Sequence, residues 1–126
     1  MRDRTVIFTI NGMLFEYDDD KNQKNIKKHG ISFPVAARVF FDYNRIEMYD
    51  EENSIDEDRY DTIGNISAES GIATIGSGVE SKDILFVVYT ERFTTNSDGK
   101  EIDVTRIISA RMATNFERGL YYGKHE

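Results

Sequence analysis

The sequence contains no cysteine and no tryptophan among its 126 residues, and only one proline. Without cysteine the chain can form no disulfide and offers no thiolate nucleophile, and we expect it in the reducing cytoplasm. Histidine is also scarce, because His29 and His125 are the only two. A zinc site made of the usual cysteine and histidine ligands is therefore not expected, and we predict neither a metal nor a cofactor.

Long apolar runs are missing as well. The longest, ILFVVY at residues 84–89, is far shorter than the roughly 20 residues that a membrane-spanning helix needs. The N-terminal residues MRDRTVIFTINGML include an early acid and no small-residue cleavage site, so we expect no signal peptide and no membrane partner. A length of 126 residues with 39% hydrophobic and 31% charged residues predicts one globular domain spanning residues 1–126.

Positive charge is in deficit, with 16 basic against 23 acidic residues and a formal net charge of −7. This balance argues against broad electrostatic adhesion to nucleic acid. The charges are unevenly distributed, however. Residues 50–61, DEENSIDEDRYD, contain seven acids, whereas residues 21–29, KNQKNIKKH, contain four lysines, a histidine and no acid. A local basic site on an acidic protein is therefore possible.

Local signals predict the first elements of the chain. Residues 4–10 and 13–17 flank the pair Asn11-Gly12, which is typical of a tight hairpin turn. A helix should follow from Asp18 or Asp19 to residue 29, since acids suit its start and Gly30 suits a left-handed C-cap. A second short helix is predicted after Ser32, with an apolar stripe on one side. That stripe consists of Phe33, Ala36, Ala37 and Phe40.

Beyond residue 44 the hydrophobic pattern alternates with a period of two, which indicates strands. The expected strands cover residues 45–49, 60–66, 84–90 and 104–112, and residues 72–75 could form a continuation or an edge. Residues 114–117, TNFE, match a capping box that opens a C-terminal helix through Tyr122. The order of elements predicts an α+β fold: an antiparallel sheet with two N-terminal helices and a short C-terminal helix.

The first predicted helix carries the basic cluster. Lys21, Lys24 and Lys28 are spaced so that they share one helix face, and Asn25 and His29 lie one step around the helix. This arrangement could bind a polyanion, but it could equally be a solvated helix face. His29 in the last turn could also interact with the negative end of the helix dipole.

The predicted strands carry a second polar group. Thr90, Glu91 and Arg92 end the most apolar strand, Arg59 precedes another strand, and Arg106, Ser109 and Arg111 lie on the last one. On a regular strand Ser109 and Arg111 share a face, whereas Arg106 points the other way. Several arginines at strand ends could build a phosphate cradle, because guanidinium binds phosphate through two hydrogen bonds. Surface ion pairs with the abundant acids are the alternative.

Four blocks of sequence follow one another in a characteristic order. They are Phe15-Glu16-Tyr17-Asp18, Lys21, Asn25, Lys28-His29-Gly30, Phe33 and Ala36 or Ala37; Asp58-Arg59-Tyr60 with Ile63-Gly64; residues 87–92, VVYTER; and residues 106–111 with Ala113-Thr114 and Glu117-Arg118. Together these blocks resemble the signature of the BrnT family, the toxins of type II toxin–antitoxin modules. The resemblance covers about residues 14–122.

This resemblance implies a RelE-like α+β fold and RNA cleavage without a metal ion. It also implies a cognate BrnA-like antitoxin with a dimeric ribbon-helix-helix part, in an expected heterotetramer that reaches DNA only through the antitoxin. In such cleavage the 2′-OH attacks the adjacent phosphate, which requires a base, an acid for the leaving 5′-oxygen and cations for the developing charge. The residues expected at the catalytic site are Lys28, His29, Arg59, Glu91, Arg92 and Arg111. The residues expected to contact RNA are Lys21, Lys24, Asn25, Thr90, Arg106 and Ser109.

Within the catalytic set, His29 is the one side chain whose ordinary pKa is near neutral, and Glu91 is a second candidate base. A binding module that keeps the fold without the activity is the alternative function, and the acidic charge favours it. An enzyme acting on a small molecule is a third reading, for which the sequence offers no feature of its own.

Overall fold

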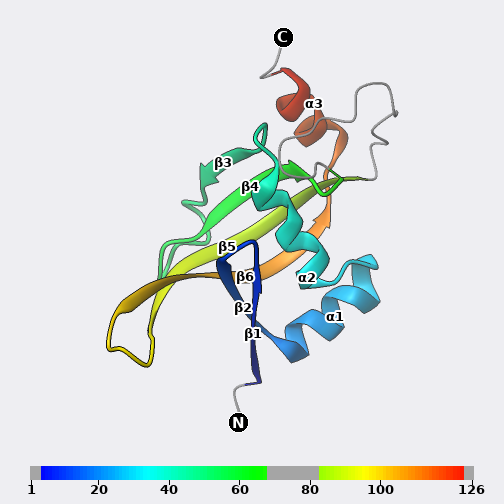
Figure 1. The fold of residues 1–126 in the computed structure, drawn as a ribbon. Helices are drawn as coiled ribbons and strands as arrows, with labels where there is room; N and C mark the ends of the chain where they lie inside the picture. The colour runs from blue at the N-terminus through cyan, green and yellow to red at the C-terminus, as the bar shows by residue number, and fades with distance from the viewer. Residues whose placement is uncertain (1–3, 68–82, 124–126) are drawn as a thin grey trace.

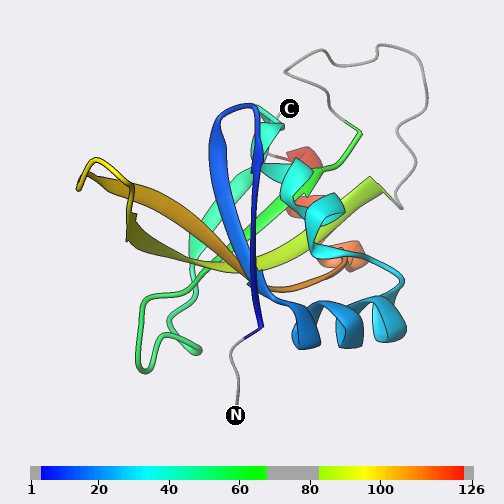
Figure 2. The same cartoon turned by 60° about the horizontal axis from the view of Figure 1, so that its bottom comes forward.

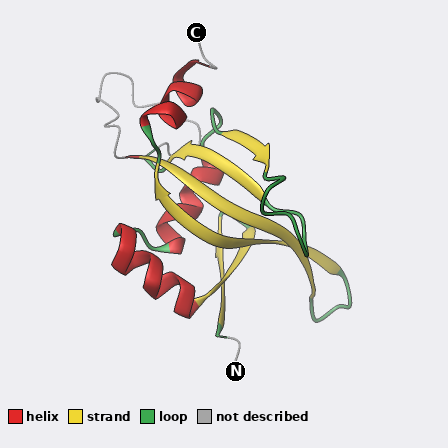
Figure 3. Ribbon diagram, turned by 180° about the vertical axis from the view of Figure 1, so that it is seen from behind, coloured by secondary structure: helices red, strands yellow, loops and turns green. Residues whose placement is uncertain are grey.

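The structure, a computed structural model, describes residues 4–67 and 83–123. Its centre is a six-stranded mixed sheet in the order β1-β2-β6-β5-β4-β3 (Figures 1 and 3). The strands are β1 (Thr5–Ile10), β2 (Met13–Asp18), β3 (Ile46–Tyr49), β4 (Tyr60–Asn65), β5 (Ile84–Thr95) and β6 (Glu101–Met112). The helices are α1 (Asp19–His29), α2 (Phe33–Ala36), the 3-10 helix η1 (Ala37–Phe41) and α3 (Asn115–Gly123).

The N-terminal hairpin forms at the predicted position. Asn11 and Gly12 both have positive φ, at 49° and 82°, as the tight turn requires. The hairpin then joins the sheet through β2, which runs parallel to β6 and pairs with it at Phe15 and Glu16. The α+β fold is confirmed, but the prediction of a purely antiparallel sheet is wrong at this one pairing. A parallel pair joins segments far apart in the chain, which local signals do not reveal.

Helix α1 has the predicted caps but not an apolar core face. The Asp18 side chain accepts from the Lys21 backbone N–H, and Gly30 ends the helix at φ 72°. Ile26, the one apolar residue, remains 38% exposed, and the buried side chains are Asn22 and Asn25. The asparagines replace apolar packing with hydrogen bonds to the backbone of neighbouring segments.

Asn25 fixes α1 to the sheet. Its Oδ1 accepts from the Ala110 backbone N–H at 3.2 Å, and its Nδ2 donates to the carbonyls of Ala110 at 2.8 Å and Ile31 at 2.9 Å. The short β2–β6 pairing ends before this point, so the amide side chain continues the hydrogen bonding of β6 where strand β2 does not reach.

The main core lies between the sheet and the helices α2 and η1 (Figure 2). The predicted stripe is buried, and Phe40 meets Tyr89 edge-on at 4.8 Å between ring centroids. Ser32 accepts from the Val35 backbone N–H, which confirms the predicted N-cap. Gly64 is required where η1 crosses β4, because a Cβ there would lie 2.9 Å from the Cβ of Val39.

A second, smaller core lies on the opposite face of the sheet, where α3 packs against Ile63 and Ile84. The predicted capping box opens α3: the Thr114 N–H donates to Glu117, and the Glu117 N–H donates to Thr114. The Tyr121 hydroxyl donates to the buried carboxylate of Asp42 at 2.6 Å. This hydrogen bond joins α3 to the end of η1.

Strands β5 and β6 are longer than predicted. They extend to Thr95 and Glu101 and form a hairpin that projects away from the helices (Figure 1). The possible strand at 72–75 lies outside the described residues, as does His125. No helix in the described ranges is long and apolar enough to cross a membrane.

Candidate functional site

The face of the sheet opposite α2 and η1, called the open face below, collects arginines from β5 and β6. Arg111 lies there with its guanidinium 4.2 Å from the centroid of the Phe86 ring. Arg106 lies there too, because it bonds to Glu16, whose strand neighbours Phe15 and Tyr17 point into the main core. The alternation of β5 then places Arg92 on the same face as Thr90.

A bulge in the β5–β6 pairing brings these arginines together. Val88 pairs with Ser109 but Tyr89 pairs with Ile107, so Ile108 is an extra residue in β6. The extra residue reverses the alternation, and Arg106 shares a face with Ser109 and Arg111. The prediction that Arg106 points the other way is therefore wrong, since it assumed a regular strand.

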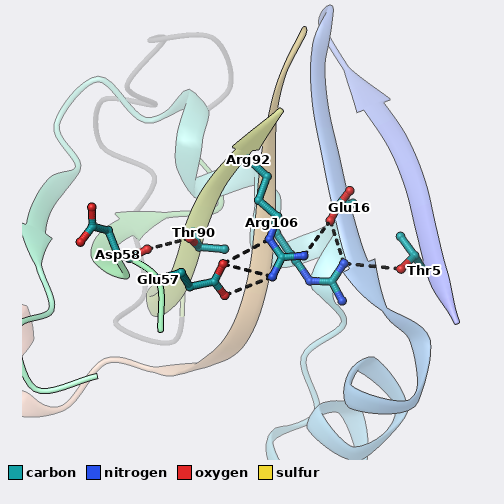
Figure 4. Close-up of polar contacts among 7 residues, drawn as sticks. All are labelled: Thr5, Glu16, Glu57, Asp58, Thr90, Arg92 and Arg106. Atoms are coloured by element: carbon teal, nitrogen blue, oxygen red, sulfur yellow. Dashed lines mark hydrogen bonds and ion pairs between the residues drawn. The ribbon is translucent and has the colours of Figure 1, made fainter. Parts of the chain in front are cut away.

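Arg92 and Arg106 form ion pairs with glutamates in the arginine–glutamate cluster, which consists of Glu16, Glu57, Arg92 and Arg106 (Figure 4). Arg106 Nη1 donates to Glu16 at 2.7 Å, and its side chain is 12% exposed. Arg92 donates from Nη2 to both Glu57 oxygens at 3.1 Å and lies 3.7 Å from Glu16. Two guanidinium groups thus converge on one patch.

Glu57 belongs to the acidic loop, residues 50–59, which joins β3 to β4. The Thr90 hydroxyl donates to the Asp58 carbonyl at 2.6 Å, which ties the loop to β5 (Figure 4). Ser54 Oγ accepts from the Arg59 N–H at 2.8 Å, and Asp50 binds Asn53. Thr90 is 1% exposed, and its hydroxyl holds the loop rather than facing solvent.

Arg111 forms a two-pronged ion pair with Glu117 at 2.7 and 2.9 Å. The hydrogen bonds that Arg111 donates to Glu117 raise the pKa of Arg111, and the same contacts lower the pKa of Glu117. The pair therefore stays charged. Ser109 is half-buried on the same face.

The open face also carries a carboxyl pair, Asp50 and Asp61, which the sequence predictions missed. Burial, a hydrogen bond to Asp50 and the charge of Asp50 raise the pKa of Asp61 to about 7. Burial opposes the shift at Asp50, but hydrogen bonds with Asn53 and Asp61 lower its pKa. Among the described residues, the buried Asp61 Oδ1 has no hydrogen-bond partner. One sequence signal could have revealed this carboxyl pair. In the strand segment YDTIGN, the alternation places Asp61 on the same face as the apolar Ile63, which is unusual for an acid.

The Lys28–His29 pair lies on the other side of the sheet. His29 lines a hollow of about 440 Å³ together with Leu85 and Met112, which pair across β5 and β6 and face away from Arg111. Lys21, Lys24 and Lys28 are exposed on α1. The structure therefore does not bring the predicted basic helix and the arginines into one site.

Glu91 also faces away from the arginines, since it follows Tyr89 on the alternation of β5. Partial desolvation and the charges of Asp103 and Glu47 raise its pKa. Arg59 stands where the acidic loop meets β4, and its charge acts on Asp50. Asn25 is buried, and its side-chain amide is bound to backbone groups of Ile31 and Ala110.

The family model described as "Ribonuclease toxin, BrnT, of type II toxin-antitoxin system" matches residues 17–117, which is more than half of the chain. The chain belongs to the BrnT ribonuclease toxin family. This membership implies an RNA substrate and a cognate antitoxin. No curated protein matches the chain.

The matched range includes Arg92, Arg106, Arg111 and the acidic loop, so the BrnT match covers most of the open face. Glu16 lies one residue outside it. Within residues 4–67 and 83–123, no group of three or more His, Asp or Glu side chains could hold a metal ion. Metal independence and location in the cytoplasm stay predictions.

Proposed function

We propose that this BrnT-family protein cleaves RNA on the open face of its sheet, by attack of a 2′-OH on the adjacent phosphate without a metal ion. The observation that supports this site most is the bulge at Ile108, because it turns Arg106 to the face that also carries Arg92 and Arg111. Guanidinium groups bind phosphate oxygens in pairs and stabilise the charge that develops during phosphate substitution.

Asp61 is the proposed proton-transfer group. As the bond from the 2′-oxygen to phosphorus forms, the 2′-OH proton passes to the Asp50–Asp61 pair. The bond from phosphorus to the 5′-oxygen breaks, and the pair returns a proton to that oxygen. A carboxyl pKa of about 7 suits both steps near neutral pH. The pair lies beside Arg111, whose charge acts on Asp61.

The experiment is induced expression of the chain in a bacterium, with growth, total RNA and the chemistry of RNA ends as readouts. Growth arrest with new 2′,3′-cyclic phosphate ends is expected. Arg111→Ala and Asp61→Asn should each lower the cleavage rate by about 10²–10³-fold. His29→Ala tests the earlier assignment of the base, and we expect it to retain cleavage.

If His29→Ala abolishes cleavage and the open-face variants do not, the catalytic site lies at the end of α1 and not on the open face. Ends carrying a 5′-phosphate and a free 3′-hydroxyl would contradict 2′-OH attack. Intact RNA and normal growth with folded protein would favour the second function, a catalytically silent binding module. One observation favours that alternative: Arg92, Arg106 and Arg111 each already contact an internal carboxylate.

For the partner, we propose an antitoxin with a ribbon-helix-helix dimer, two toxins and two antitoxins in the complex, and DNA bound only through the antitoxin. The sequence resemblance supports this proposal, together with the type II membership that implies an antitoxin. The RelE-like character of the fold is proposed on the same basis.

A further inference from the structure

We propose that Glu57 competes with RNA phosphate for the guanidinium group of Arg92. Its carboxylate occupies the paired N–H donors of Arg92, called the fork below, which an RNA phosphate must bind instead. The inference rests on the proposed RNA site. Arg92 contacts Glu57 through Nη2 at 3.1 Å to both oxygens and through Nε at 3.3 Å. A phosphodiester presents two oxygens to guanidinium in the same two-pronged way, so carboxylate and phosphate exclude each other at this fork.

The two ion pairs of the cluster differ in how readily they can open. The Arg106 and Glu16 side chains are 12% and 13% exposed, so this pair is nearly buried and holds β2 to β6. The Arg92 and Glu57 side chains are 41% and 31% exposed. An ion pair that water can reach contributes little net stability, and a competing anion can displace it. Arg92 is therefore the exchangeable position, and Arg106 is the fixed one beside it.

The acidic loop keeps the competitor at the fork. The Thr90 hydroxyl holds the Asp58 carbonyl, one residue from Glu57, and Ser54 closes the loop on Arg59. These contacts hold the backbone, so only the Glu57 side chain has to move when phosphate arrives. The high local concentration of this carboxylate makes it compete as an intramolecular ligand.

This exchange explains how an RNA site operates on a protein of net charge −7. A single small anion gains nothing by replacing Glu57, since one negative charge replaces another. A strand that also engages Arg111, whose side chain is 36% exposed, adds contacts that Glu57 cannot offer. The fork therefore favours a multi-phosphate RNA strand over isolated anions.

The test measures binding of a fluorescein-labelled, 2′-O-methyl 20-mer RNA, which cannot undergo 2′-OH attack, by fluorescence polarisation from 50 to 200 mM salt. Glu57→Gln should tighten binding roughly fivefold at the lowest salt, because it frees the fork. It should also steepen the slope of log K against log salt by about 0.7, the value for one added phosphate contact on a single strand.

Glu52→Gln is the matched control. Glu52 lies in the same loop, carries the same charge and makes no hydrogen bond or ion pair among the described residues. It should change affinity less than twofold and leave the slope unchanged. Glu57→Ala is the second variant, and it should reproduce the effect of Glu57→Gln. Thermal unfolding of each variant confirms that it is folded.

Equal affinities and slopes for Glu57→Gln and Glu52→Gln would overturn the competitor role. If Arg92→Ala still weakens binding in that case, the proposed RNA site stands and only this inference fails. No binding by the wild type or by any variant at 50 mM salt would overturn both. Binding that appears only in Glu57→Gln and Glu57→Ala would support the inference most strongly.

Discussion

The two faces of the sheet are built from different chemistry, although the same strands form both. On the face under α2 and η1, aromatic rings pack together, with Phe15 5.6 Å from Phe40 and Phe40 4.8 Å from Tyr89 between centroids. On the open face, residues of neighbouring strands such as Glu16 and Arg106 form ion pairs. The larger core lies on the face under α2 and η1, whereas the open face combines a smaller core beneath α3 with charges that water partly reaches.

The largest expected effect lies on the apolar face. Phe15→Ala removes a fully buried ring and should lower the free energy of unfolding by about 3–5 kcal/mol, measured by urea denaturation. Ile7→Ala, at a position 56% exposed on the neighbouring strand, is the control and should cost less than about 1 kcal/mol. Equal losses at the two positions would contradict the assignment of the main core to the face under α2 and η1.

A smaller loss is expected where α1 meets the edge of β6. Asn25→Ala leaves the Ala110 N–H and two carbonyls without their partner, and it should cost about 3 kcal/mol. Lys24→Ala, exposed on the same helix, should stay within about 0.5 kcal/mol of wild type. A mild Asn25→Ala variant would show that α1 is not fixed to the sheet by this amide.

The smallest effect concerns the open face and depends on pH. The raised pKa of Asp61 means that the folded protein holds a proton there that the unfolded chain releases above about pH 4. Its contribution to stability is present at low pH and is lost as pH rises through about 7. Above pH 7 the ionised carboxyl lies beside Asp50 and near Glu117, and it destabilises the fold.

Asp61→Asn should therefore raise the melting temperature by roughly 3–5 °C at pH 8, and by much less at pH 5. Differential scanning calorimetry at both pH values checks this. A gain that is the same at pH 5 and pH 8 would contradict it. A variant that is more stable at pH 8 but inactive would also fit a site where function is kept at the expense of stability.

Local sequence signals predicted the helices and strands. They failed for features that depend on contacts between segments far apart in the chain. Asn11-Gly12, the Gly30 cap and the Thr114 capping box act within a few residues, so the sequence alone revealed them. The parallel β2–β6 pairing and the burial of Asn25 depend on residues about 85 to 90 positions away.

The candidate site shows the same division. The family resemblance pointed to Arg92, Arg106 and Arg111 by type, but their shared face depends on the bulge at Ile108. The local sequence pattern does not predict this β-bulge, which adds one residue to β6. For the same reason the predictions grouped His29 with arginines from which a sheet separates it.

The pairing of β2 with β6 sets an order on biosynthesis. Glu16 leaves the ribosome 90 residues before its partner Arg106, so the β1–β2 hairpin has to wait for the last strand. Until β6 has been synthesised, Arg106 and Arg111 are absent and β2 has only β1 to pair with. The open face therefore assembles as one of the last events in the synthesis of the domain, and any chemistry that this face supports begins only then.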